Sequence, residues 1–518
     1  MNTLAERRLE LRAAHGARQS RLRLPNPGDV FMLAAFGWAA VCFLLVTGGQ
    51  RFARQVARLG RSETVSNLVL TEQTAIAGIM IAGLIGLGVT FFFLTRFRWV
   101  SIGLFLFSMS FASALWPPLH DLAFAIKYLI IIYLASYATL FFYRNGWRLI
   151  DTKGYRLVCV YVAWIGFIAV YNGLKVGDVW YFGTEFCLMI GFGIAWLRDV
   201  DTTDKLRKFN MVFAFAAIAV TLGHMLSPLV FPEYTYLSRF VSMFERATGF
   251  SVTYAPYVVV LFWASMYDKN AVRQRVFSAF AVIGFGLILW SGTRNATVAT
   301  LIGVFGLWWV FRTKLLVYVV AAGMIGLLVQ IVIGGNEDLA LLGERLASLK
   351  NTRSDLWELY LGLAKQSPLL GYGWDGLTSA VYGESLVNAI GNFIRVTIPA
   401  VHNHYLGFLV RFGMVGLILN LMIIVLPLLR AWRVVFSPNV ALQDKQVYVL
   451  PAALLLVVVL EGLFEDTMGS TGKGTLHGLI FALAIPVVYL FGGQLLNAAN
   501  AEQSRRAPVA RTLRRELS

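Results

Sequence analysis

Charged residues and cysteines are both scarce in this sequence. Asp, Glu, Lys and Arg make up 14% of the 518 residues and hydrophobic residues 58%, whereas a soluble globular protein is roughly 45–50% apolar. A soluble multidomain protein is therefore excluded. The three cysteines, Cys42, Cys159 and Cys187, lie inside apolar segments without CxxC spacing. The sequence thus predicts neither a disulfide framework nor a zinc site.

Acidic residues are the scarcer of the charged residues, with 28 Asp and Glu against 45 Lys and Arg and a net charge of +17. A basic balance can indicate nucleic-acid binding. Here, however, Lys and Arg concentrate beside the apolar runs, where the positive-inside rule and anionic lipid headgroups account for them. The first 28 residues are rich in arginine but hold no apolar core or cleavage site, so we expect a basic cytoplasmic arm and no signal peptide.

Apolar runs long enough to cross a bilayer recur along the whole chain. We predict an all-α polytopic membrane protein with about 12–14 transmembrane helices. The candidate runs are 30–48, 74–94, 99–116, 122–142, 157–173, 179–197, 209–231, 252–267, 276–293, 295–311, 315–334, 404–429, 447–465 and 476–495. Every second connection is rich in Lys and Arg, which predicts that both termini are cytoplasmic.

This pattern divides the chain into five parts. We expect a basic arm at 1–28, helices 1–11 within 29–334, a large outward loop at 335–401, helices 12–14 within 402–496, and a basic cytoplasmic tail at 497–518. No internal repeat is visible.

The first outward connection departs from the charge rule. Arg51, Arg54, Arg58 and Arg61 recur there at helical spacing. We favour an interfacial helix facing anionic headgroups, and a broken first span is the alternative.

The outward loop 335–401 is long enough to suggest a function of its own. Its segment "NTRSDLWELYLGLAK" has a capping-box pattern at Thr352 and Asp355, and Leu356, Tyr360 and Leu363 share one side of a predicted helix. A Pro/Gly turn cluster, "SPLLGYGWDG", follows.

Cationic side chains gather on the predicted outer side. They are Arg246, Arg294, Arg353, His402 and His404. An arginine fork binds phosphate and keeps its charge, so a diphosphate is the ligand that this grouping favours.

Arg294 lies in a hairpin with almost no loop. Ser291, Gly292 and Thr293 precede it, and such small residues let a ligand approach the backbone closely. The alternative is a snorkelling anchor at a helix end.

Two of the six histidines lie in the segment "VHNHYLGFLVRFGMVG", where a span begins. A neutral imidazole at His402 or His404 can take a proton from a hydroxyl, so we expect a general base. Two residues apart, the imidazoles would point to different faces of a helix, and no nearby carboxylate or cysteine completes a metal site. His120, His224 and His477 are predicted to be structural.

Acidic candidates on the outer side are Glu461, Glu465 and Asp466, near the end of the thirteenth span. Ionisable groups in a membrane are functional candidates. They could orient an acceptor or pair with an arginine, and the alternative is a helix-end group facing water.

These segments resemble the O-antigen ligase and O-antigen polymerase-like membrane glycosyltransferases. His402 and Asn403, nine further residues, Gly413, two residues and Gly416 fit the family signature. "SPLLGYGW" resembles the turn before the family's histidine, "SGTRNATVA" its arginine segment, and "RATGFSVTYAP", more weakly, an earlier arginine segment. Together they cover roughly residues 240–420.

The resemblance implies a glycosyltransferase-C-like fold in a bacterial inner membrane, with an active site facing the periplasm and 335–401 as a large periplasmic loop. It implies inverting, metal-independent transfer of a glycan from undecaprenyl diphosphate, without a cofactor. His402 would be the base, and Arg294 and Arg246 would stabilise the diphosphate. The remaining substrate-binding candidates are Arg353, His404, Asn403 and Tyr372.

The acceptor stays open, because ligases that use lipid A core and polymerases that use a second glycan share donor and leaving group. A transporter or lipid-linked glycan flippase is the alternative function. It predicts half-repeats and midplane charges, of which Glu185 is the main example. A non-catalytic assembly subunit would not need cations gathered on one face.

Overall fold

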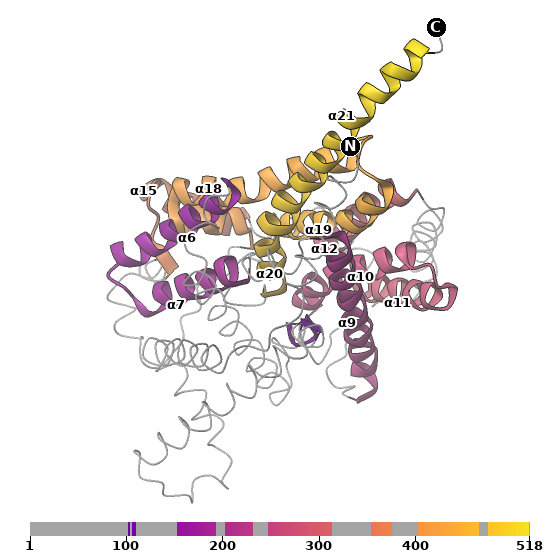
Figure 1. The fold of residues 1–518 in the computed structure, drawn as a ribbon. Coiled ribbons are helices and arrows are strands. Elements are labelled where there is room, and N and C mark those ends of the chain that lie inside the picture. Colours follow the sequence, from indigo (N-terminus) through magenta and orange to yellow (C-terminus); the bar gives the residue numbers. More distant parts are fainter. Residues whose placement is uncertain are drawn as a thin grey trace, which may run out of the picture.

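The computed structural model describes residues 102–103, 106–109, 153–192, 202–230, 247–312, 354–374, 377, 402–465 and 475–516 (Figure 1). All regular secondary structure in these residues is helical. Eight of the described helices are long and apolar enough to cross a membrane. The chain is therefore an all-α polytopic membrane protein, as its composition predicts.

The described helices follow one another in a single series. They are α6 (Lys153–Tyr171), α7 (Val176–Glu185), the π-helix η2 (Phe186–Phe192), α9 (Thr203–Val230), α10 (Ala247–Tyr267), α11 (Ala271–Trp290), α12 (Arg294–Phe311), α15 (Ser354–Gln366), α18 (His404–Phe436), α19 (Leu442–Glu461), α20 (Thr475–Leu483), the π-helix η4 (Ala484–Phe491) and α21 (Gly492–Glu516).

Nine of the predicted apolar runs coincide with these helices, from 157–173 to 295–311 and from 404–429 to 476–495. The runs 30–48, 74–94, 122–142 and 315–334 lie outside the described residues, as do the arm 1–28 and the stretch Arg51–Arg61, and run 99–116 is described only in part. The total of about 12–14 helices therefore stays a prediction.

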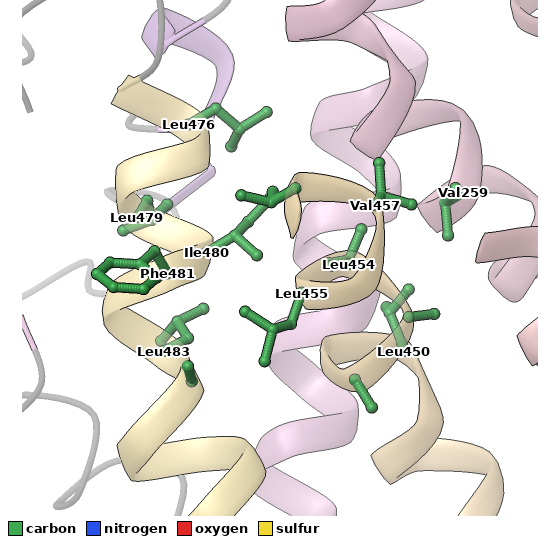
Figure 2. Close-up of a cluster of buried hydrophobic side chains, with 14 of the residues drawn as sticks. Val259, Leu450, Leu454, Leu455, Val457, Leu476, Leu479, Ile480, Phe481 and Leu483 are labelled. Atoms are coloured by element: carbon green, nitrogen blue, oxygen red, sulfur yellow. The ribbon is translucent and has the colours of Figure 1, made fainter. Parts of the chain in front are cut away.

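The centre of the bundle is α10, which is buried on every side in its membrane segment. A helix that is apolar on nearly all sides is typical of such a core position. Beside it, α12 packs closely on α19, because a Cβ added to Gly303 would lie 2.6 Å from Cγ2 of Val457. Small residues allow this kind of close helix contact in membranes. Figure 2 shows Val457 directed toward Val259 of α10.

α20 and the π-helix η4 that continues it run antiparallel to α19. At one end His477 of α20 contacts Glu461, and at the other the hydroxyl of Tyr448 donates to the carbonyl of Val488 in η4 at 2.6 Å. Between these points an apolar cluster joins the two helices (Figure 2). α12 and α18 begin at one end of the bundle, where α19 also ends. We call this end of the bundle the site end.

α18 consists of two helices joined at Gly413, where φ is 66° and ψ is −174°. This conformation is almost exclusive to glycine. The kink removes the carbonyl of Phe412 from the helical ladder, and the indole Nε1–H of Trp164 donates to it at 2.9 Å. A Cβ at Gly416 would lie 3.1 Å from the same indole nitrogen. Both glycines of the signature thus serve the packing of α18 on α6.

The turn at 367–374 fits against this kink. The Met414 N–H donates to the carbonyl of Pro368 at 2.8 Å, and the Tyr372 N–H donates to that of Val410 at 3.0 Å. A side chain at Gly413 would overlap the carbonyl of Leu369. The glycine is therefore required for this contact as well as for its own backbone angles.

The outward loop contains the helix that its pattern predicts. In α15, Tyr360 and Leu363 are buried with Val410 of α18, and Leu356 packs against them. Thr352, of the predicted capping box, lies outside the described residues.

Candidate functional site

His402 lies immediately before α18 in a left-handed conformation, with φ of 50°. Asn403 is the N-cap of the helix, and its Oδ1 accepts from the N–H of Leu406 at 3.0 Å. The left-handed backbone of His402 changes the direction of the chain before α18 begins. Its side chain therefore does not lie in line with any face of α18. Asn403 serves as the cap, and contact between Asn403 and a substrate stays a prediction.

The imidazole of His402 is paired with a carboxylate. Its Nδ1 lies 2.9 Å from Oε2 of Glu465, and the side chains are 36% and 14% exposed. An imidazole that donates Nδ1–H to a carboxylate keeps a lone pair on Nε2. Glu465 thus orients His402 and leaves its other nitrogen available as a base.

Two further contacts fasten the start of α18 to the end of α19. The backbone N–H of His404 donates to the carbonyl of Gly462 at 2.8 Å, and the Tyr405 hydroxyl donates to that of Val459 at 3.0 Å. The turn after α19 carries Glu465 and is therefore held beside His402. The two residues of the pair are 63 positions apart in the chain.

A second carboxylate–imidazole pair lies beneath the first. Nε2 of His477 is 2.6 Å from Oε2 of Glu461, and both side chains are 0% exposed. The structure pairs Glu461 with His477 and Glu465 with His402, whereas Asp466 lies outside the described residues. The sequence predicts a structural role for His477, and its complete burial agrees with that prediction.

Whereas His402 is partly exposed, His404 is buried. Its side chain is 2% exposed and its ring packs against Tyr405 and Phe408. The two imidazoles of the doublet therefore do not share one surface. A substrate-binding role for His404 stays a prediction that this position does not favour.

Arg294 is the first residue of α12 and is exposed. The turn before it is built by Gly292, with φ of 66°, and by Ser291, whose Oγ donates to the carbonyl of Ile288 at 2.6 Å and accepts from the N–H of Thr293 at 3.3 Å. The small residues thus form a tight corner. The positive end of a helix and a guanidinium meet there, and both attract phosphate.

Helix packing brings Arg294 to the same end of the bundle as His402. Gly303 of α12 faces Val457 of α19 and Val259 of α10, and Trp263, further along α10, donates to the carbonyl of Gln446 near the start of α19. α10 and α19 are therefore antiparallel. Short turns join α10 to α11 and α11 to α12, so α12 returns in the direction of α10 and is antiparallel to α19. Arg294 precedes Gly303 by nine residues and Glu465 follows Val457 by eight, so each lies about 12–14 Å or less beyond that crossing. Arg294 and the His402–Glu465 pair, which we call the dyad, are therefore at a similar level along the bundle.

The turn that contains Tyr372 is anchored to α6 and α7. The N–H of Trp374 donates to the Asp178 carboxylate, and Nδ2 of Asn172 donates to the carbonyl of Tyr372 at 3.1 Å. The guanidinium of Arg411 lies 4.1 Å from the centre of the Trp374 ring. This turn therefore has a clear structural purpose, and substrate binding by the Tyr372 side chain stays a prediction.

Two predicted cations precede described helices. Arg246 comes before Ala247, the first residue of α10, and Arg353 before Ser354, the first residue of α15. Both arginines lie outside the described residues.

Comparison with known families supports the assignment of this region. Residues 279–421 match the family described as O-antigen ligase, which confirms the resemblance seen in the sequence. The match includes Arg294, Tyr372 and His402, whereas Glu465 and His477 lie beyond it. The search of curated proteins gave no significant match.

Proposed function

We propose, from the match of residues 279–421 to the O-antigen ligase family, that this membrane protein transfers a glycan from undecaprenyl diphosphate to a sugar hydroxyl at the periplasmic face of the bacterial inner membrane. It acts as an O-antigen ligase on lipid A core or as a closely related polymerase. The single observation that carries this proposal is the His402–Glu465 pair, at the end of the bundle where Arg294 begins α12.

The pair supports proton removal from the acceptor. Glu465 accepts the Nδ1–H of His402, and Nε2 takes the proton of the acceptor hydroxyl. The hydroxyl oxygen attacks the anomeric carbon, and the bond from that carbon to the diphosphate oxygen breaks. Attack opposite the leaving group inverts the configuration. The proton resides on the imidazole beside the Glu465 carboxylate until it is released to water.

The leaving group takes the electron pair of the broken bond, so negative charge grows on the diphosphate. Arg294 offers a fixed positive fork at the surface, and the N-terminal N–H groups of α12 point the same way. Stabilisation of developing charge by such preorganised groups is usually a large part of catalysis. In this proposal these groups, with Arg246, do the work of a divalent cation, and the reaction needs no cofactor.

The proposal is tested with purified protein in detergent and EDTA. A lipid-linked glycan is the donor, and lipid A core or a second lipid-linked glycan is the acceptor. We expect product on one acceptor, full activity with EDTA, and loss of activity in His402→Gln. Folding of the variant is checked by thermal unfolding.

Glu185→Gln is the matched control and also tests the transporter alternative. Glu185 is buried on α7, whereas His402 precedes α18. We expect this variant to transfer glycan at the normal rate. If neither acceptor is extended by the intact protein, and Glu185→Gln abolishes lipid-linked glycan movement in vesicles, glycan transfer is wrong and a flippase is correct.

A further inference from the structure

We propose that Glu461 and His477 form a positioning pair, which holds Glu465, and through it His402, in the geometry for proton transfer. This inference rests on the proposed function. Neither residue would touch a substrate, because both side chains are fully buried. Their role would be to set where the orienting carboxylate of the dyad lies.

Stability does not explain the Glu461–His477 pair. Oε1 of Glu461 and Nδ1 of His477 have no hydrogen-bond partner among the described residues. Each such buried polar atom costs free energy, and buried ion pairs replaced by apolar residues often leave a protein as stable or more so. A buried pair with two unsatisfied atoms therefore points to a functional role.

The backbone connects Glu461 directly to Glu465. The carbonyl of Glu461 accepts from the N–H of Phe464 at 3.0 Å and from that of Glu465 at 2.9 Å. The turn that presents Glu465 to His402 therefore begins at the Glu461 peptide. A displacement of Glu461 would displace Glu465 with it.

Charge connects the two carboxyl groups as well. Glu465 lies close enough to Glu461 to act on it electrostatically. Two carboxylates at close range repel each other, so a change of charge at Glu461 would act on Glu465.

The helices around the pair are held together by apolar packing. Ile480 of α20 is directed toward Leu454 and Leu455 of α19 (Figure 2). This contact keeps His477 opposite Glu461. A shift of α20 would therefore displace Glu461 and, with it, Glu465 and His402.

The test compares Glu461→Gln, Glu465→Gln and the double variant in glycan transfer. Gln keeps the size of the side chain and removes the acid. We expect Glu461→Gln to lower kcat about tenfold, as small misplacements of reacting groups do, with KM for the donor unchanged. In the Glu465→Gln background it should lower kcat no further, because its effect passes through Glu465. A merely structural role would give additive losses.

The control Glu185→Gln removes another buried carboxyl and should keep normal kcat.

A second measurement is independent of glycan transfer. Diethyl pyrocarbonate modifies exposed imidazoles, and mass spectrometry reports the rate at His402 alone. At pH 8.5, above the ordinary titration range of imidazoles, a carboxylate on Nδ1 makes Nε2 more nucleophilic. We expect His402 to react more slowly in Glu465→Gln and in Glu461→Gln, and no more slowly in the double variant than in Glu465→Gln.

The two readouts separate the possible failures. If the intact protein transfers no glycan but Glu461→Gln slows the modification of His402, the proposed function is wrong and the positioning pair stands. If glycan is transferred and Glu461→Gln changes neither kcat nor the modification rate, the positioning pair is wrong. Additive effects of the two substitutions would also overturn it.

Discussion

A carboxylate bonded to one nitrogen of an imidazole decides which nitrogen can act as a base. In His402 the bonded atom is Nδ1, 2.9 Å from Glu465. Nε2 is therefore the atom that would receive the acceptor proton. The left-handed backbone of His402 and the capping of α18 by Asn403 hold this arrangement at the start of the helix.

Glu465→Gln should lower kcat about 10²-fold, within the range that general base catalysis contributes. The amide can donate to Nδ1 and so favours the wrong tautomer of His402. KM for the lipid-linked donor should stay within the error of the measurement, because Glu465 is not expected to contact the diphosphate. Steady-state transfer kinetics check both values.

Glu502→Gln, on the exposed surface of α21, is the control for loss of one negative charge. It should transfer glycan at the normal rate. Unchanged kcat in Glu465→Gln would show that the pair with His402 has no part in catalysis.

Arg294 is expected to act through its planar fork. Arg294→Ala should reduce kcat/KM for the donor about 10²-fold, as loss of one charge-stabilising donor does. Arg294→Lys keeps the charge but loses the bidentate geometry, so we expect an intermediate loss of about tenfold, or ~1.4 kcal/mol.

The same helix offers a matched control. Arg312 is exposed at the opposite end of α12, where its guanidinium lies 5.8 Å from the centre of the Trp309 ring. Arg312→Lys should leave kcat/KM unchanged. Equal losses at both ends would mean that Arg294 affects the helix and not the diphosphate.

At the scale of the element, the kink in α18 joins the outward loop to the membrane helices. The turn 367–374 donates to and accepts from the backbone on both sides of Gly413, and Asn172 and Asp178 bind the same turn from α6 and α7. The loop and three helices are thus fastened at one point.

Gly413→Ala should lower the melting temperature in detergent or prevent folding. The backbone conformation alone costs about 1–3 kcal/mol for a residue other than glycine, and the added methyl would overlap the Leu369 carbonyl. Thermal unfolding followed by intrinsic fluorescence measures the effect.

Gly306→Ala is the control at this scale. Gly306 lies on α12, and among the described residues no atom outside its own helix backbone would be within 4 Å of an added Cβ. Alanine favours a helix over glycine by about 1 kcal/mol, so we expect an unchanged or higher melting temperature. A normal melting temperature in Gly413→Ala would contradict the role of the kink.

At the scale of the whole molecule, helix direction places the site and the α18–α19 connection at opposite ends. The part of α18 after Gly413 has 23 residues and is about 34 Å long, enough to cross a bilayer core. Ala441, at the start of α19, is therefore expected on the cytoplasmic side and α15 on the periplasmic side.

Cysteine labelling tests this orientation. In a variant without the three native cysteines, Lys365→Cys on exposed α15 should react with a membrane-impermeant maleimide in intact spheroplasts. Ala441→Cys should react only after lysis. The reverse pattern would invert the orientation and place His402 in the cytoplasm.

The sequence by itself determined the membrane helices and the main candidates for chemistry. Apolar runs are local signals, since a helix satisfies its own backbone in lipid. Nine runs therefore coincide with described helices, and the pattern of Leu356, Tyr360 and Leu363 predicts α15. The family signature contains His402 and the separate segment "SGTRNATVA" contains Arg294. Both residues were candidates because their neighbours in the chain are recognisable.

Only the tertiary structure decided which side chains meet. Glu465 is 63 residues from His402 and belongs to another helix, so no local pattern specifies their pairing. The burial of His404 and the partner of Glu461 likewise depend on how α18, α19 and α20 pack. Periodicity places a side chain on a face of its own helix, but its neighbours are determined by the contacts of that face with the rest of the bundle.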